Sequence, residues 1–350
     1  MIIIDNIIYS LQKAGGISVY FSEILNKLVA NSYQFKVLHY ENDNQILKEY
    51  QQDKIFTAKK VLLPLVIARY MDVFIPKESK VFHSSYYRLP IFFQRRKVKI
   101  VTTVHDFTYE RYIGGFSSKI HHWQKKRAVL ASDIVICISE NTKKDLIHYI
   151  PQAKNKDIRV IYNGVSEFFF PLLTDDDSKN KDNILFIGSR VGYKNFNSLV
   201  IAMEQLTDMK LVIVGGGSIT YDEGMLLEQY CGGRYRHINF VSNEQLNGLY
   251  NQAFCLVYPS LYEGFGIPAI EAMRSGCPVI AANRSSIPEV CDDASILLDD
   301  VNPNNIAEAV NSLRDKATRE KLIESGFNNS SRFSWDNMFQ ELSKIYLGNK

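Results

Sequence analysis

Short apolar runs, each followed by a helical pattern, restrict the fold of this chain more than any other feature. Most of these runs are rich in β-branched or aromatic residues, which is typical of strands buried on both faces of a parallel sheet. Strands that alternate with helices indicate an α/β protein with doubly wound sheets. We predict strands over 1–4, 35–39, 81–83, 99–104, 134–138, 184–187, 210–214, 238–241, 255–258, 279–281 and 295–297.

A polar, acidic stretch without periodicity, PLLTDDDSKNKDN at 171–183, divides the chain. Its composition is typical of a linker, and 350 residues are too many for one typical domain. We therefore predict a Rossmann-like domain over 1–168, a linker over 169–183, a second Rossmann-like domain over 184–332, and a helix over 333–350 that returns to the first domain. Open α/β sheets bind ligands at the carboxyl ends of their strands, so the active site is expected in a cleft between the two domains.

The cysteines and the apolar segments exclude several classes of protein. The five cysteines form no CxxC pair and do not lie near histidine at zinc-ligand spacing, which argues against a disulfide framework and a metal site. The N-terminal MIIIDNIIYS has an acidic residue and no basic region, so it indicates a strand and not a signal peptide. No run of eighteen apolar residues occurs, and the apolar segment 61–76 is interpreted as a buried or interfacial helix.

The charge is distributed unevenly along the chain. Residues 1–170 contain 25 Lys and Arg against 15 Asp and Glu, whereas the remainder carries a net charge of −7. Basic clusters lie at 95–99 and 125–127. One interpretation is solvated surface; the other is that this half faces an anionic partner, such as a bilayer or a lipid pyrophosphate. No nucleic-acid-binding module is recognisable, so nucleic acid is not an expected partner.

The stretch YEGFGIPAIEAM at 262–273 joins a predicted strand to a predicted helix. Its glycines permit close approach by a ligand, and Pro268 suits the first turn of a helix. Free N–H groups of residues 264–267 therefore gather at a helix N-terminus, where phosphate binds readily. Glu263 precedes this loop and Glu271 lies one turn into the helix, and carboxylates accept hydrogen bonds from sugar hydroxyls. The alternative is that both acids have ordinary solvent or helix-dipole roles.

Three further loops follow predicted strands. FIGSRVGYKN at 186–195 places two cations after a glycine turn, which suits a pyrophosphate. A glycine pair at 15–16 opens an amphipathic helix, and a His-Asp pair at 105–106 ends a buried strand. Each has an ordinary structural interpretation, because basic loops, glycine turns and lone histidines are common without function. No Asp-x-Asp motif stands at a strand end; the acidic run 175–177 lies in the predicted linker.

These motifs together resemble the retaining glycosyltransferases of the GT-B fold, family 4. The resemblance covers nearly the whole chain and is most specific in EGFGIPAIEAM, SGCPVIA and the run ending in PEV. It implies that Glu263 binds hydroxyls of the donor sugar and that Glu271 binds the nucleotide ribose. It also implies that donor phosphate binds to Arg190 and Lys194, and to the loop amides of Gly264, Phe265, Gly266, Ile267 and Gly16.

The resemblance also assigns roles to three other loops. His105 corresponds to a histidine near the donor sugar, with catalytic contact and proton handling as its implied task, and Asp106 follows it. Gly15 corresponds to a glycine loop that meets the donor sugar or the acceptor. The turn at Val241 and Ser242 corresponds to backbone near the nucleobase.

The expected function is transfer of a hexose from a nucleotide sugar, with retention, to a hydroxyl of a lipid-linked or oligosaccharide acceptor in bacterial surface polysaccharide biosynthesis. GDP-mannose is the first choice of donor, and UDP-linked sugars remain open. We expect no cofactor and no metal, and a cytoplasmic protein that associates with the inner face of the cytoplasmic membrane. The alternatives are a GT-B sugar-nucleotide epimerase, a glycan phosphorylase, and a non-catalytic nucleotide-sugar-binding subunit.

Overall fold

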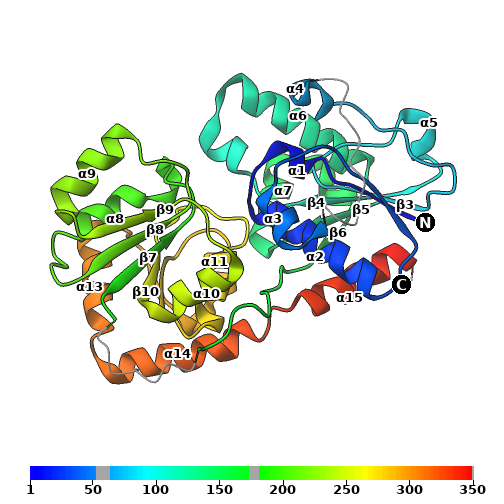
Figure 1. Ribbon diagram of the computed structural model, residues 1–350. Coiled ribbons are helices and arrows are strands. Elements are labelled where there is room, and N and C mark those ends of the chain that lie inside the picture. Colours follow the sequence, from blue (N-terminus) through cyan, green and yellow to red (C-terminus); the bar gives the residue numbers. More distant parts are fainter. Residues whose placement is uncertain (53–63, 173–180, 349–350) are drawn as a thin grey trace. The chain divides into compact units, whose positions relative to one another are not determined.

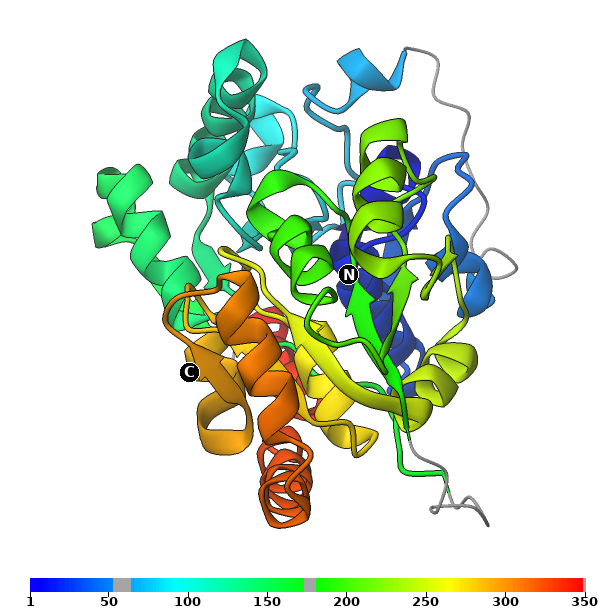
Figure 2. The same ribbon diagram turned by 90° about the vertical axis from the view of Figure 1, so that its left-hand side faces the viewer.

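The computed structural model describes residues 1–52, 64–172 and 181–348. Two compact units can be distinguished: Met1–Asn163 together with Trp335–Lys350, and Gly164–Ser334. Each unit contains one six-stranded sheet in which all paired strands are parallel, and its helices lie on both sides of the sheet (Figures 1 and 2). Both units are therefore Rossmann-like, as the alternation of strands and helices predicts.

The sheet of the first unit has the strand order β2-β1-β3-β4-β5-β6. Its central strands are buried on both faces, because β1, β3 and β5 consist of apolar or hydrogen-bonded residues without an exposed position. The elements of this unit are β1 (Ile2–Asp5), α1 (Ile8–Leu11), α2 (Gly16–Ala30), β2 (Phe35–Leu38), α3 (Gln45–Glu49), α4 (Leu65–Ala68), β3 (Val81–Ser84), α5 (Phe92–Arg95), β4 (Lys99–Val104), η2 (Tyr109–Ile113), α6 (Gly115–Ala131), β5 (Ile134–Cys137), α7 (Glu140–Tyr149), η3 (Pro151–Asn155), β6 (Asp157–Val160) and α15 (Trp335–Leu347).

The sheet of the second unit has the strand order β12-β11-β10-β7-β8-β9. Its strand β10 is buried at every position and lies between β7 and β11. The elements are β7 (Asn183–Ile187), η4 (Gly192–Lys194), α8 (Phe196–Ala202), β8 (Lys210–Val214), α9 (Tyr221–Cys231), β9 (Tyr235–Ile238), α10 (Asn243–Gln252), β10 (Ala253–Tyr258), α11 (Ile267–Arg274), β11 (Val279–Ala282), α12 (Ile287–Cys291), η5 (Asp292–Ala294), β12 (Ile296–Leu298), α13 (Pro303–Ser312) and α14 (Lys316–Ser330).

The last helix, α15, belongs to the first unit and packs against α2. Its apolar residues recur at helical spacing, and all six are buried: Trp335, Met338, Phe339, Leu342, Ile345 and Tyr346. Tyr346 also hydrogen-bonds through its hydroxyl to Nδ1 of His83 on β3, at 2.7 Å. Burial lowers the pKa of His83 to about 3, so this imidazole is neutral at physiological pH.

Two sequence-based assignments are wrong. The strand predicted over 238–241 ends earlier, as β9 covers Tyr235–Ile238. A helix over 61–76 does not form in its described part, since only Leu65–Ala68 is helical and residues 61–63 lie outside the described residues. Beyond this turn Val73 joins Pro90 in a β-bridge, with its N–H donating to the Leu89 carbonyl at 2.8 Å. Pairing with a distant segment therefore prevails over the apolar content of this stretch.

The five cysteines at 137, 231, 255, 277 and 291 are free and buried. Burial raises the pKa of each thiol, to about 12 for Cys137, Cys277 and Cys291 and to about 11 for Cys231. These side chains act as small apolar core residues.

Candidate functional site

The loops after β7 and β10 form the candidate site of the second unit. These strands are neighbours in the sheet, so their carboxyl ends lie side by side (Figure 1). The backbone N–H of Leu261 donates to the Tyr193 carbonyl at 2.8 Å and ties the two loops together. Lys194 Nζ then lies 2.5 Å from Glu263 Oε1, and both side chains are mostly buried. Two residues predicted from separate motifs therefore form one ion pair.

Glu263 forms hydrogen bonds with three neighbouring side chains. Its backbone N–H donates to Ser285 Oγ at 2.9 Å, and Ser286 Oγ donates to its carbonyl at 2.9 Å. Burial raises the pKa of Tyr258 well above its usual value, followed by the charge of Glu263 and a hydrogen bond to its carboxylate, so Tyr258 remains a donor. The backbone and carboxylate of Glu263 are thus fixed before any ligand arrives.

The helix α11 begins directly after this loop. Gly266 precedes it with φ of 109°, a left-handed conformation that disfavours side chains, and Pro268 stands in the first turn as predicted. The Phe265 side chain is buried against Phe333, with ring centroids 5.5 Å apart, so only its backbone can reach a ligand. The N–H groups that open α11 therefore follow Glu263 by a few residues in the same loop.

Glu271 lies further along α11 and is oriented by a buried tyrosine. Tyr250 Oη donates to Glu271 Oε2 at 2.9 Å and to the Pro268 carbonyl at 3.2 Å. Burial raises the pKa of Tyr250 well above its usual value, with the charge of Glu271 as the next cause. The tyrosine hydroxyl therefore stays protonated and fixes the carboxylate on the helix.

Arg190 is committed to contacts within the second unit. Nη1 donates to the Gly215 carbonyl at 2.8 Å, and Nη2 donates to the carbonyls of Gly217 at 3.0 Å and Ser218 at 2.9 Å. Nε is paired with Glu223 at 3.0 Å, and only 2% of the side chain is exposed. A phosphate can bind this guanidinium only if some of these contacts are released.

Val241 and Ser242 lie at the start of α10, after the edge strand β9. Ser242 caps the helix, because its Oγ accepts from the Gln245 N–H at 3.2 Å and its own N–H donates to Gln245 Oε1 at 3.0 Å. This capping box engages the Ser242 N–H and one acceptor site of its hydroxyl, while its carbonyl accepts from the Leu246 N–H at 2.8 Å.

In the first unit, His105 follows β4 and packs against α2. Its ring lies 5.1 Å from that of Tyr20 on α2, which begins at Gly16 after the extended Gly15. Burial lowers the pKa of His105 to about 4, so the imidazole is neutral at physiological pH. Nε2 has no hydrogen-bond partner among the described residues. The structure thus brings the glycine pair and the histidine to one end of the sheet.

Asp106 contacts a buried network of charged side chains that the sequence analysis did not predict. Burial raises the pKa of Asp106, but Lys125 and the Thr108 N–H outweigh it and hold that pKa below its usual value. Lys125 is 0% exposed in its side chain and donates to the Asp106 carbonyl at 2.8 Å and to Glu110 Oε2 at 3.0 Å. The basic cluster 125–127 is therefore not wholly a surface feature.

Comparisons with known proteins agree with this geometry. The family model described as "Glycosyltransferase Family 4" matches residues 14–167, and that of "Glycosyl transferases group 1" matches residues 175–329. The chain belongs to the family 4 glycosyltransferases of the GT-B fold.

The chain is also similar to a curated mannosyltransferase and to solved structures of the same fold. It is similar to the O-antigen chain mannosyltransferase B of Escherichia coli, with 26% identity over 289 residues, which are 76% of this chain and 74% of the relative. Sucrose-phosphate synthase from Thermosynechococcus elongatus shares the fold, with a TM-score of 0.78, 20% identity, and coverage of 99% of this chain and 98% of that one. Anabaena Alr3699/HepE in complex with UDP and glucose does so with a TM-score of 0.72, 16% identity, and coverage of 100% and 99%.

The structure assigns contacts that motif matching did not. Tyr250, Tyr258, Ser285 and Ser286 orient the two acidic side chains or their loop. The serine pair lies in the polar run after β11, Tyr250 lies in the last turn of α10, and Tyr258 ends β10. No spacing rule links these residues to Glu263. Among the described residues no three or more His, Cys, Asp or Glu side chains gather as a metal site would require; metal independence stays a prediction.

Proposed function

We propose that this glycosyltransferase moves a hexose from a nucleotide sugar to a hydroxyl of a lipid-linked or oligosaccharide acceptor in surface polysaccharide biosynthesis. GDP-mannose is the first donor to test, because the Escherichia coli relative is a mannosyltransferase. UDP-glucose is the second, because a solved relative of the same fold holds UDP and glucose. The proposal includes retention at the anomeric carbon and activity without a metal.

The observation that carries this proposal is the Lys194–Glu263 pair beside the start of α11. A nucleotide sugar carries phosphate negative charge next to sugar hydroxyls, so it can replace both partners of the pair at once. The ammonium of Lys194 would pass from a carboxylate to a phosphate, and Glu263 would accept hydrogen bonds from hydroxyls. Glu271, held by Tyr250, would accept from the ribose hydroxyls.

The proposed reaction is an exchange of C–O bonds on one face of the sugar. The acceptor hydroxyl oxygen forms a bond to the anomeric carbon while the bond from that carbon to the phosphate oxygen breaks. The hydroxyl proton passes to the departing phosphate. Lys194 and the N–H groups of Gly264–Ile267 would stabilise the charge that develops on the nucleoside diphosphate. Arg190 would join them after exchanging carbonyl contacts for phosphate.

The first unit would supply the contacts around the sugar and the acceptor. A neutral His105 with an unpartnered Nε2 can exchange a hydrogen bond with a hydroxyl. Asp106 and the backbone of Gly15 and Gly16 lie at the same end of the sheet. We propose that the enzyme works in the cytoplasm at the inner face of the membrane. No helix of the described residues is long and apolar enough to span a bilayer.

A thermal-shift screen over GDP, UDP, ADP and their sugars tests the donor. Ligand at about a hundredfold excess over its dissociation constant stabilises the folded state by about 2.7 kcal/mol, and the stabilising donor is then used in a transfer assay with NMR of the product anomer. Inversion of the anomer, or unchanged transfer by both Lys194→Ala and Glu271→Ala, would remove the proposed mechanism. A stable glycosyl-enzyme adduct in mass spectra would replace front-face attack by a covalent route.

The same assays separate the alternatives. A phosphorylase would show the absorbance of a lysine-bound pyridoxal cofactor, and an epimerase would convert the nucleotide sugar without an acceptor. A binding subunit would be stabilised by donor and transfer nothing.

A further inference from the structure

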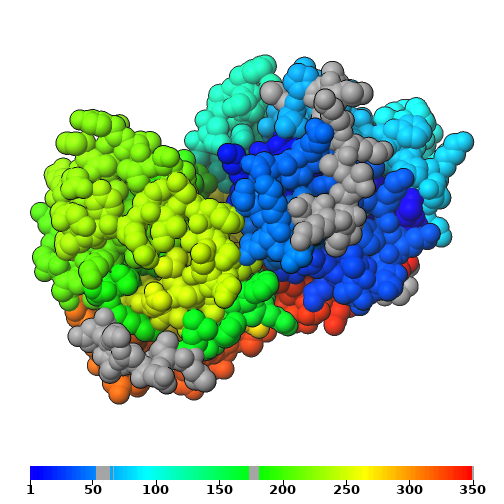
Figure 3. Space-filling model, in the orientation of Figure 1, coloured from blue at the N-terminus to red at the C-terminus, as the bar shows by residue number. Residues whose placement is uncertain are grey.

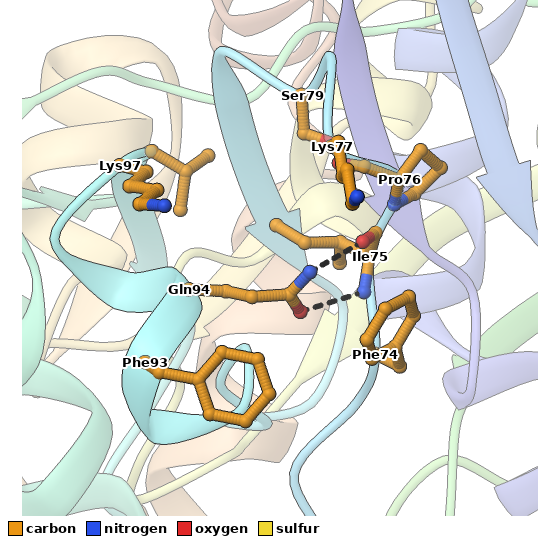
Figure 4. A pocket seen from close by; sticks show the side chains of 9 residues that line it. Phe74, Ile75, Pro76, Lys77, Ser79, Phe93, Gln94 and Lys97 are labelled. Carbon is orange, nitrogen blue, oxygen red and sulfur yellow. Dashed lines mark hydrogen bonds between the residues drawn. The ribbon is translucent and has the colours of Figure 1, made fainter.

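A cavity of about 300 Å³ opens on the first unit between the segment after Val73 and the helix α5 (Figure 4). Its walls are aromatic and aliphatic, with Phe74 and Phe93 on one side and Lys77 and Lys97 on the other. None of its nine lining residues is acidic. No predicted catalytic or donor-binding residue lines it.

Phenylalanines around this cavity are exposed to an unusual degree. Phe74, Phe92 and Phe93 are 66%, 74% and 67% exposed. Large apolar side chains grouped on a surface are costly in water and mark interaction sites. In the space-filling view the segment that bears them, light blue to cyan, stands at the surface of its unit (Figure 3).

Hydrogen bonds, a β-bridge and an ion pair join the two segments that carry these phenylalanines. Gln94 on α5 joins that helix to the segment after Val73. Its Nε2 donates to the Ile75 carbonyl at 2.6 Å, and its Oε1 accepts from the Ile75 N–H at 2.9 Å. The β-bridge between Val73 and Pro90 and the ion pair of Arg95 with Asp72, at 2.5 Å, hold the same two segments. These bonds fix the backbone of the two segments that carry the exposed phenylalanines.

Exposed aromatic and basic side chains extend from the cavity toward α6. Asp72 pairs with Arg95 and, at 2.8 Å, with Arg127. The Arg95 guanidinium lies 5.9 Å from the Phe92 ring, and that of Arg127 lies 5.2 Å from the ring of Trp123 on α6. Trp123 is 54% exposed. We call Phe74, Phe92, Phe93, Trp123, Lys77 and Lys97 the aromatic-basic surface.

We infer that the aromatic-basic surface docks on an anionic lipid bilayer, with its aromatic rings at the headgroup level and its lysines against lipid phosphates. Aromatic rings favour the membrane interface, and lysines near an anionic leaflet attract it. A second copy of the chain fits less well, because a two-fold interface would bring these lysines against themselves. The exposed Glu78, next to Lys77, locally weakens the attraction between the lysines and anionic headgroups. The inference deepens the proposed function, because a lipid-linked acceptor lies in a bilayer.

Vesicle flotation of the full-length protein tests the surface without any transfer reaction. We expect binding to vesicles of phosphatidylcholine with phosphatidylglycerol, weaker binding to phosphatidylcholine alone, and loss of binding as salt rises. Lys77→Gln with Lys97→Gln should weaken binding by about fivefold per lysine. Phe74→Ser with Phe93→Ser should weaken it by at least about tenfold.

Matched controls lie on the second unit. Tyr221→Ser removes an aromatic that is 80% exposed, and Lys321→Gln removes an exposed lysine; neither should change vesicle binding. Trp123 supplies an internal probe, because the chain has two tryptophans and the other, Trp335, is 5% exposed. Brominated lipids should quench the fluorescence of Trp123 in the wild type and not in the double phenylalanine variant.

Several results would overturn the inference: no binding of the wild type to anionic vesicles at low salt, full binding by both double variants, equal loss in the controls, or no quenching by brominated lipid. A concentration-dependent dimer that the phenylalanine variant abolishes would assign the surface to a second copy instead. Transfer to a water-soluble acceptor is measured separately and should be unchanged in the variants. If the wild type does not catalyse that reaction, the result contradicts the proposed function but not the inference of bilayer binding.

Discussion

The Lys194–Glu263 ion pair makes one substitution, Glu263→Gln, act in opposite directions on two ligands. A nucleoside diphosphate without sugar must take Lys194 from Glu263 and offers the carboxylate nothing in return. A nucleotide sugar offers both a phosphate and hydroxyls. We therefore expect Glu263→Gln to bind the diphosphate more tightly and the nucleotide sugar more weakly than the wild type.

The size of the effect follows from the burial of the pair. Lys194 Nζ and Glu263 Oε1 are 2.5 Å apart, with side chains 13% and 12% exposed. Two charges about 4 Å apart attract by about 4 kcal/mol at an effective dielectric constant near 20, and loss of hydration offsets a large part. Hydrogen bonds to charged groups contribute about 1.5–3 kcal/mol net. Tenfold tighter binding of the diphosphate needs about 1.4 kcal/mol, which is just below this range.

Isothermal titration calorimetry on wild type and Glu263→Gln, with each diphosphate and its sugar, measures both effects. Lys194→Gln is the companion variant and should weaken both ligands. The exposed pair of Asp208 and Arg314 supplies the control, because Asp208→Asn removes a 2.8 Å ion pair of the same unit whose partners are 60% and 42% exposed. That variant should bind like the wild type. Equal or weaker binding of the diphosphate by Glu263→Gln would refute the competition between carboxylate and phosphate.

Three further results are expected. Tyr250→Phe removes the hydroxyl that donates to Glu271, so urea denaturation should show a loss of about 1 kcal/mol and calorimetry a severalfold weaker nucleotide. Burial lowers the pKa of His105 to about 4 from 6.5 in the unfolded chain, so its stabilising contribution is complete above pH 6.5 and is lost as the pH falls toward 4. The free energy of unfolding of His105→Gln, measured by urea denaturation, should therefore depend less steeply on pH between 6.5 and 4 than that of the wild type. Gly216→Ala puts a Cβ 2.5 Å from a guanidinium nitrogen at φ of 79° and should lower the free energy of unfolding by about 2 kcal/mol or more, whereas Gly248→Ala, in open space within α10, should not.

Local chemistry explains which parts of the site the sequence could predict. Pro268 in the first turn of α11 and the Ser242 cap follow from backbone hydrogen bonding within a few residues. The six-residue stripe of α15 follows from its helical period. Such features need no knowledge of the rest of the chain.

Partners far apart in sequence explain what it could not predict. Arg190 and Lys194 looked equivalent as loop cations, yet one binds the carbonyls of residues 215–218 and the other binds Glu263. Lys125 looked like surface charge, but it packs over the Phe107 ring at 4.0 Å and pairs with Glu110. Charge counts do not identify these neighbours, because packing of β–α units determines them.

The five buried thiols give this enzyme a practical advantage for spectroscopy. Maleimide reacts with the thiolate, and burial both raises the thiol pKa and blocks access. A single cysteine introduced in place of Phe93 should therefore take up a dye in the native protein while the natural cysteines stay unlabelled. An environment-sensitive dye at that position would follow lipid contact in real time, without the need for a cysteine-free background.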